Sequence, residues 1–178
     1  MIFVNGLQRS GTNFAKLQFK NSVDACWPYW KHDLKTQDVQ PKDCSAVKCI
    51  IKNPYTWVES ICFRNPVDII QWFSGLHLYD QKDYFGPHKI NLIRLISLYS
   101  FFYTSWMAYE KTKLIKYEDL LVLSSVKVDT VDYSTDWDPS RRKSYLEYET
   151  TLLNRNDINT INKTLGKKFF KKINYPMK

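Results

Sequence analysis

The sequence predicts an α/β fold, a three-layer sandwich in which a parallel β-sheet is flanked by helices. Three apolar segments of strand length, residues 1–4, 46–51 and 113–117, alternate with segments whose apolar side chains have helical spacing. Strands that alternate with helices favour a parallel sheet that is covered on both faces. The chain has 178 residues, 44% of them hydrophobic, which predicts one domain over residues 1–178 with a sizeable core.

The first predicted strand, residues 1–4, ends at the turn-forming pair Asn5-Gly6. Residues 12–21 follow with apolar spacing and helix-forming neighbours, so that a loop joins the strand to a helix. This order is the first half of a βαβ unit.

The second predicted strand, residues 46–51, is stopped by Asn53-Pro54, and helical spacing resumes over residues 55–63. A long helix is predicted over residues 90–109, where apolar side chains recur at intervals of three and four, and it leads into the third strand. A second junction between a strand and a helix therefore follows the first.

The C-terminal third contains a polar segment, residues 129–140, which is typical of a surface loop. Helices are predicted over residues 145–153 and 157–165, and Gly166 stands where a helix commonly ends. The lysines beyond it are interpreted as the solvated face of a helix.

Three features of the sequence bear on the cellular location of the protein: its first residues, its longest apolar stretch and its cysteines. The chain does not open with a charged segment and a long apolar stretch, so no signal peptide is expected. The most apolar later stretch, residues 90–107, is interrupted by polar residues, which disfavours a membrane span. The four cysteines form no Cys-x-x-Cys pair, and no secretion signal is expected, so we expect a cytoplasmic protein with reduced thiols and no metal site.

The net charge of +8 favours an anionic partner wherever the charge is concentrated in a cleft. Nucleic acid, an acidic glycan and a nucleotide all satisfy this condition, and so does a protein whose charge serves only its solubility. Motif positions are needed to choose among them.

Residues 6–13, Gly-Leu-Gln-Arg-Ser-Gly-Thr-Asn, form the loop between the first strand and the first helix. Unpaired backbone N–H groups at such a junction bind phosphate. The glycine spacing matches a nucleotide phosphate loop, but Thr12 and Asn13 stand where an ATP-binding loop carries Lys and Ser or Thr. The cation is inside the loop instead, at Arg9, where its planar guanidinium can bind an oxyanion. The alternative is a glycine turn with a surface arginine.

This loop resembles the phosphosulfate-binding loop of the sulfotransferase family, whose members take a sulfuryl group from 3′-phosphoadenosine 5′-phosphosulfate (PAPS). The family's loop has Lys or Arg followed by Ser-Gly-Thr, and commonly an aromatic residue that stacks on adenine. The resemblance implies that the cation is Arg9, that the aromatic residue is Phe14, and that the residues between them bind the donor: Ser10, Gly11, Thr12 and Asn13.

A second motif strengthens the resemblance. Lys52-Asn53-Pro54, with Ser60 eight residues after the lysine, is similar to the family's Arg-Asn-Pro and serine, which reach the 3′-phosphate. Lysine keeps the charge of the family's arginine but lacks its bidentate fork, so weaker affinity for that phosphate is expected.

Two later segments extend the resemblance from residue 2 to about residue 175. Residues 117–120, Tyr-Glu-Asp-Leu, are similar to a family segment in which the tyrosine, here Tyr117, lies near the nucleotide; the alternative is that Tyr117 belongs to the core. The basic residues Arg141, Arg142 and Lys143 resemble the ending of many bacterial members, and we expect them to close over the 3′-phosphate.

The resemblance implies metal-independent, in-line transfer from PAPS to a hydroxyl or amine of a small-molecule or carbohydrate acceptor, with PAP as the product and no nucleic acid or membrane as a partner. Arg9 and the loop N–H groups would stabilise charge on the leaving phosphate. His32 is the expected base that removes the acceptor's proton. His77 and His88 belong to a polar, aromatic-rich stretch expected on the acceptor side. A small-molecule kinase, or a catalytically silent protein that binds nucleotide or nucleic acid, is the alternative.

Overall fold

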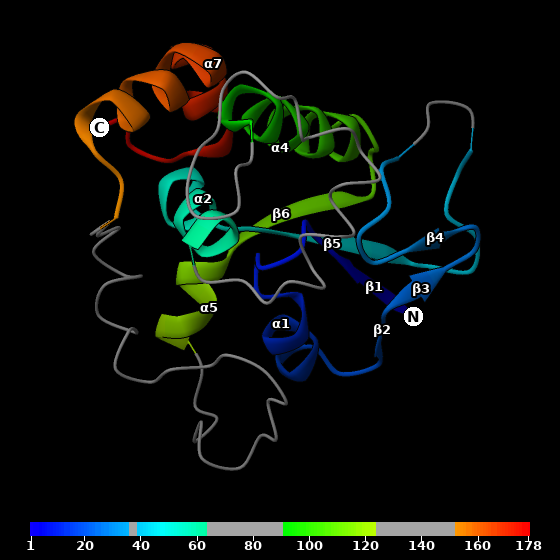
Figure 1. Ribbon diagram of the computed structural model, residues 1–178. Helices are drawn as coiled ribbons and strands as arrows, with labels where there is room; N and C mark the ends of the chain where they lie inside the picture. Colours follow the sequence, from blue (N-terminus) through cyan, green and yellow to red (C-terminus); the bar gives the residue numbers. More distant parts are fainter. Residues whose placement is uncertain (36–38, 64–90, 124–151) are drawn as a thin grey trace.

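The computed structural model describes residues 1–35, 39–63, 91–123 and 152–178 (Figure 1). In these ranges the chain forms a parallel β-sheet with helices on both faces, which confirms the predicted α/β class. Among the described helices, none combines the length and the apolar character that a membrane span requires.

The main sheet has four parallel strands, and β1 and β5 pair at its centre. The strands lie in the order β2 (Ser22–Val23), β1 (Ile2–Asn5), β5 (Ala46–Ile51) and β6 (Thr112–Lys116). Ile2 pairs with Ala46 and Asn5 with Cys49, so the ends of β1 and β5 lie at the same edge of the sheet.

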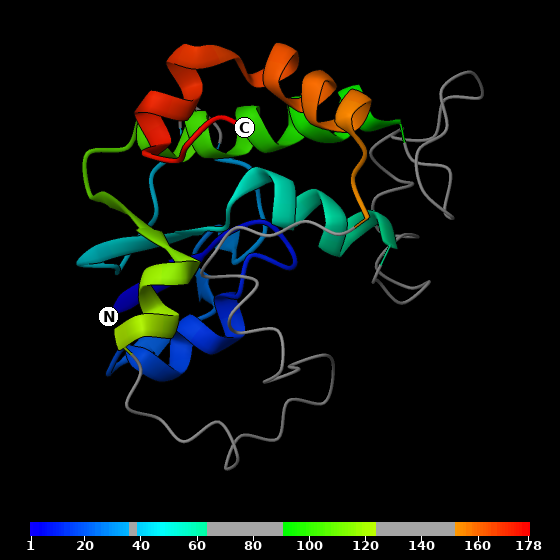
Figure 2. The same ribbon diagram turned by 90° about the vertical axis from the view of Figure 1, so that its left-hand side faces the viewer.

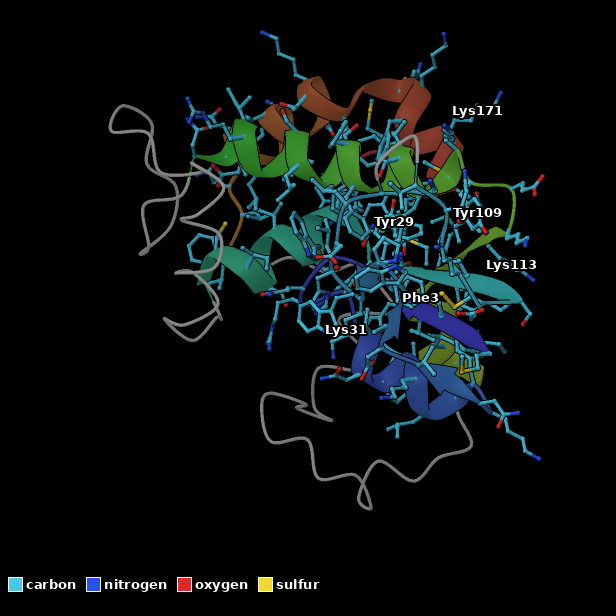
Figure 3. All side chains as sticks on the ribbon, turned by 90° about the vertical axis from the view of Figure 1, so that its right-hand side faces the viewer. Phe3, Tyr29, Lys31, Tyr109, Lys113 and Lys171 are labelled. Atoms are coloured by element: carbon cyan, nitrogen blue, oxygen red, sulfur yellow. A yellow bond between two sulfur atoms is a disulfide. The ribbon has the colours of Figure 1, made fainter. Side chains whose placement is uncertain are left out.

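Two short strands that the sequence analysis did not predict form an antiparallel hairpin beside the sheet. They are β3 (Ala25–Cys26) and β4 (Tyr29–Trp30). Phe3 of the sheet and Tyr29 of the hairpin, both labelled in Figure 3, pack edge-on against Trp106, with ring centroids 5.7 and 5.2 Å away. The hairpin is therefore anchored to the core by aromatic contacts.

Helices divide between the two faces of the sheet (Figures 1 and 2). One face carries α1 (Thr12–Gln18) and α5 (Tyr117–Leu123), and the other carries α2 (Pro54–Phe63), α4 (Leu92–Met107) and, packed on α4, α7 (Arg155–Ile173).

The alternation of strand side chains explains this division. Val4 and Ile50 belong to the smaller core cluster with Phe14, whereas Phe3 and Ile51 belong to the larger, aromatic-rich cluster on the opposite face. Successive strand residues point to opposite faces, so each central strand supplies both clusters.

Several predicted boundaries differ from the observed ones. Helix α1 ends at Gln18, and the segment that opens with Tyr117 is a helix. Helix α7 does not end at Gly166: that residue has a φ of 71° and forms a kink, after which the helix continues to Ile173. Burial of Phe169, Phe170 and Ile173 against the core favours this continuation, and tertiary packing of this kind overrides local end signals. The predicted loop 129–140 and nearly all of the predicted helix 145–153 lie outside the described residues.

The expectation that all cysteines are reduced is wrong for two of them. Cys26, at the end of β3, is joined by a disulfide to Cys44, just before β5, whereas Cys49 and Cys62 are buried free thiols. The hairpin brings the two partners, 18 positions apart in the sequence, to a Cα–Cα distance of 6.4 Å. Such an approach depends on the path of the chain between them, which Cys spacing does not reveal.

Candidate functional site

The helices that follow the two central strands lie on opposite faces of the sheet. Strand β1 leads into α1 on one face, and β5 leads into α2 on the other. In open α/β sheets a crevice forms outside the carboxyl ends of neighbouring strands whose connections diverge in this way, and ligands bind there. The loop of residues 6–13 and Lys52 both lie at this edge.

The loop after β1, here called the first junction (residues 6–13), turns through two left-handed residues. Arg9 has a φ of 66° and Gly11 a φ of 90°, and the Ser10 N–H donates to the Leu7 carbonyl at 3.0 Å. Backbone turns of this kind build concavities that bind anions. The local conformation thus fits the phosphate-binding role predicted for the loop.

Both glycines of the first junction are required by close approach. A Cβ on Gly6 would lie 2.5 Å from the Ile50 carbonyl oxygen, and a Cβ on Gly11 would lie 2.2 Å from Cδ2 of Tyr117. The indole Nε1 of Trp57, on α2, donates to the Gln8 carbonyl at 2.8 Å. The first junction is therefore fixed directly against β5, α2 and α5.

The second junction (residues 52–56) joins β5 to α2 and holds the predicted Lys52 and Ser60 together. Lys52 Nζ donates to Ser60 Oγ at 3.1 Å, and both residues are only 3% exposed. Lys52 Nζ also lies 5.6 Å from the ring centroid of Tyr117. Tyr117 is therefore next to Gly11 of the first junction and Lys52 of the second.

His32 lies two residues after β4 and contacts the start of the first junction. Its Nδ1 is 2.6 Å from the Gly6 carbonyl oxygen, and the Gly6 N–H donates to the Lys31 carbonyl at 2.9 Å. A carbonyl only accepts, so Nδ1 carries the proton and the lone pair of the neutral ring is at Nε2. Burial lowers the pKa of His32 to about 4, more than the Gly6 hydrogen bond raises it. The imidazole is neutral at pH 7.

The residues beside His32 also contact the first junction. Lys31 Nζ donates to Asn13 Oδ1 at 2.8 Å and lies 3.9 Å from an oxygen of Asp24 (Figure 3 labels Lys31). The Trp30 ring meets the His32 ring edge-on, with centroids 4.8 Å apart. The orientation of His32 is thus set by the hairpin on one side and the loop on the other.

The structure gathers most of the predicted site residues at one edge of the sheet. Phe14 is 3% exposed and packs edge-on against Tyr117, with ring centroids 6.0 Å apart, inside the smaller core cluster. Arg141, Arg142, Lys143, His77 and His88 lie outside the described residues. The residues brought together are those of the first junction with Lys52, Ser60, Tyr117 and His32.

Sequence reasoning missed the side chains that support the second junction. Glu118 is 3% exposed, and one of its carboxylate oxygens accepts the Asn53 N–H at 3.0 Å. Burial raises the pKa of this carboxyl, while the hydrogen bond from Tyr175 and the nearby Lys52 oppose the rise. A carboxylate directly after the predicted third strand, residues 113–117, was the available signal, but its partners come from distant parts of the chain.

Comparisons with protein-family models, with curated proteins and with solved structures found no match. Within the described ranges, no group of three or more His, Cys, Asp and Glu side chains is arranged to hold a metal ion.

Proposed function

We propose that the protein is a sulfotransferase that uses PAPS as its donor. The observation that carries this proposal is the position of Tyr117, whose ring meets Gly11 of the first junction and lies 5.6 Å from Lys52 Nζ. PAPS carries anionic groups at both the 5′ and the 3′ position of one ribose, so its binding needs two anion sites that are close together. Two junctions that contact the same aromatic ring satisfy this need.

The side chains at the two junctions fit the two anionic ends of the donor. The turned backbone around Arg9 would bind the 5′-phosphosulfate, and the buried ammonium of Lys52 with the Ser60 hydroxyl would bind the 3′-phosphate. The ammonium of Lys52 and the hydroxyl of Ser60 lie side by side, and together they supply a cation and a hydrogen-bond donor of the kind that binds a phosphate oxygen. The motif resemblance assigns the same residues to the same two phosphates.

When bound, PAPS supplies a sulfuryl group attached to a phosphate leaving group. Arg9 and the backbone N–H groups of the first junction stabilise the negative charge that grows on the leaving oxygen. Neutral His32 accepts the proton of the acceptor hydroxyl or amine at Nε2. The basic residues 141–143 remain candidates for additional contacts with the 3′-phosphate.

Calorimetry and thermal unfolding with PAP, AMP and Mg·ATP test the proposal. PAP at 100 times its dissociation constant is expected to raise the free energy of unfolding by about 2.7 kcal/mol. AMP, which lacks the 3′-phosphate, should bind more weakly. Binding of Mg·ATP without binding of PAP would contradict the proposal and favour a kinase. Affinity for an oligonucleotide that falls steeply with salt, without affinity for PAP, would favour a nucleic-acid-binding protein.

If PAP binds, an acceptor screen with labelled PAPS tests catalysis. Transfer of label to a hydroxyl or amine of a small molecule or glycan is the expected result. PAP binding without transfer to any acceptor in a broad panel would favour a catalytically silent nucleotide-binding protein.

A further inference from the structure

The end of β5 is held by tyrosines from distant parts of the chain. The last two carbonyls of β5 and the carbonyl of the next residue each face the hydroxyl of a buried tyrosine. Each carbonyl accepts a hydrogen bond from that hydroxyl or lies within hydrogen-bond distance of it. The contacts are Tyr103 with Ile50 at 2.9 Å, Tyr175 with Ile51 at 3.0 Å and Tyr99 with Lys52 at 2.5 Å. The backbone that carries Lys52 is therefore fixed from outside the sheet.

Glu118 connects this arrangement to the C-terminal segment. Its Oε1 accepts the N–H of Asn53, the residue directly after Lys52, and its Oε2 accepts the hydroxyl of Tyr175. Tyr175 lies just beyond α7, where the chain turns back below that helix (Figure 2). Glu118 thus links the second junction to Tyr175, which lies 57 positions after Glu118 in the chain.

We propose that Glu118 and Tyr175 are positioning residues that orient Lys52 and Ser60 for the 3′-phosphate. The inference rests on the proposed function, because it assigns the Lys52–Ser60 pair to that phosphate. Lys52 Nζ reaches Ser60 Oγ, on the second turn of α2, only if the strand end and the start of α2 keep their relative orientation. The Asn53 N–H lies between these two elements, and Glu118 fixes it.

A different role for Glu118, as a counter-charge to Lys52, gives opposite expectations for two neutral variants. In Glu118→Gln the amide oxygen still accepts the Asn53 N–H, and the amide N–H can donate to the Tyr175 oxygen, which is 3.0 Å from the Ile51 carbonyl and can donate there. In Glu118→Ala both contacts are lost. If Glu118 acts through its charge, both variants strengthen binding of the 3′-phosphate; if it acts by position, only the alanine variant weakens it.

The test compares the dissociation constants of PAP and AMP by calorimetry, since their ratio isolates the 3′-phosphate. We expect Glu118→Ala to reduce this preference for PAP about tenfold or more, the effect of losing one hydrogen bond to a charged group. Glu118→Gln should keep the preference, and Tyr175→Phe should fall between the two. AMP affinity should stay unchanged in all three variants.

Tyr55→Phe is the matched control. Tyr55 is buried at the start of α2, and its hydroxyl accepts the Lys178 N–H at 2.8 Å and donates to Asn162 at 2.5 Å. This variant also removes a phenol hydroxyl that holds the C-terminal segment, but one that does not contact residues 51–53. It should leave the preference for PAP unchanged.

Hydrogen exchange at the Asn53 amide gives a readout that needs no ligand. We expect faster exchange in Glu118→Ala and, if that variant does not fold, in Tyr175→Phe, with wild-type protection in Glu118→Gln. A wild-type preference for PAP in Glu118→Ala, or an equal loss in Glu118→Gln, would overturn the positioning role while leaving the proposed function intact. A wild-type protein that binds PAP no better than AMP would overturn both.

Discussion

The two junctions at the carboxyl ends of β1 and β5 are built in different ways. The first junction depends on backbone conformation: Arg9 and Gly11 are left-handed, and neither glycine has room for a side chain. The second junction depends on side chains that arrive from α4, α5 and the C-terminal segment and bind the backbone of residues 50–53. The conformation of the first junction should therefore be sensitive to changes within its own loop. The conformation of the second junction should be sensitive to changes far away in the sequence.

The largest expected effect concerns His32, which is seated on the first junction. His32→Ala should lower turnover by about 10²- to 10⁴-fold, because it removes the proposed base. The wild-type kcat/KM should be flat near neutrality and fall only as pH approaches about 4, where the imidazole becomes protonated. Turnover of both proteins as a function of pH, measured with labelled PAPS, checks the loss in His32→Ala and the pH profile of the wild type. An unchanged rate in His32→Ala would place the base elsewhere.

Arg9→Ala tests the cation of the first junction. Turnover should fall by about 10²- to 10³-fold, the usual cost of removing a group that stabilises a developing oxyanion. The free energy of unfolding should change little, since Arg9 is partly exposed. Arg9→Lys keeps the charge and should lose less. Full turnover in Arg9→Ala would contradict the role assigned to this residue.

The burial of His32 should make stability depend on pH, because it disfavours the protonated imidazole in the folded protein. The unfolded chain binds a proton at His32 below about pH 6.5, whereas the folded chain does so only below about pH 4. The free energy of unfolding should therefore decrease as pH falls from 6.5 to 4, by about 3 kcal/mol from this group. Urea unfolding of wild type and His32→Gln at pH 7 and pH 4 measures this contribution of His32 to the free energy of unfolding. A difference between the two proteins that does not change with pH would exclude this contribution.

Gly11→Ala tests whether the first junction depends on the close approach of its backbone to Tyr117. The added Cβ meets the Tyr117 ring at 2.2 Å, in addition to the strain of a φ of 90°. Gly166→Ala is the matched control, because Gly166 has a φ of 71° but no heavy atom within 4 Å of an added Cβ. Gly11→Ala should cost about 2 kcal/mol more than Gly166→Ala in urea unfolding, the cost of overpacking alone. Equal costs would mean that Tyr117 moves away freely.

The smallest effect is expected for Asn53→Ala in the second junction. The Asn53 side chain accepts the N–H groups of Tyr55 and Thr56 at 3.0 and 3.5 Å, as a helix cap does. Its removal should cost about 1 kcal/mol in urea unfolding. The preference for PAP over AMP should stay close to that of wild type, because Glu118 binds the Asn53 backbone, which alanine keeps. A loss of that preference as large as in Glu118→Ala would show that the Asn53 side chain is needed as much as the Glu118 carboxylate to hold the junction.

The main strands and helices could be predicted because their apolar periodicity extends over several residues. The span 46–51 is predicted at the same bounds as β5, and the long helix differs from α4 by two residues at each end. Strands β2, β3 and β4 have two residues each and carry no periodicity of their own, so they form only because the core and the hairpin hold them. The Cys26–Cys44 disulfide was missed for the same reason.

The sequence by itself determined the α/β class and the placement of a glycine-containing loop and of Lys52 after two predicted strands. It did so because apolar spacing and turn residues act locally. Only the tertiary structure decided that Tyr117 contacts both junctions, that His32 bonds to Gly6, and that Glu118 and Tyr175 hold the backbone next to Lys52. Those contacts join residues 26 or more positions apart, and such pairs meet only when the packing of the sheet and its helices brings them together.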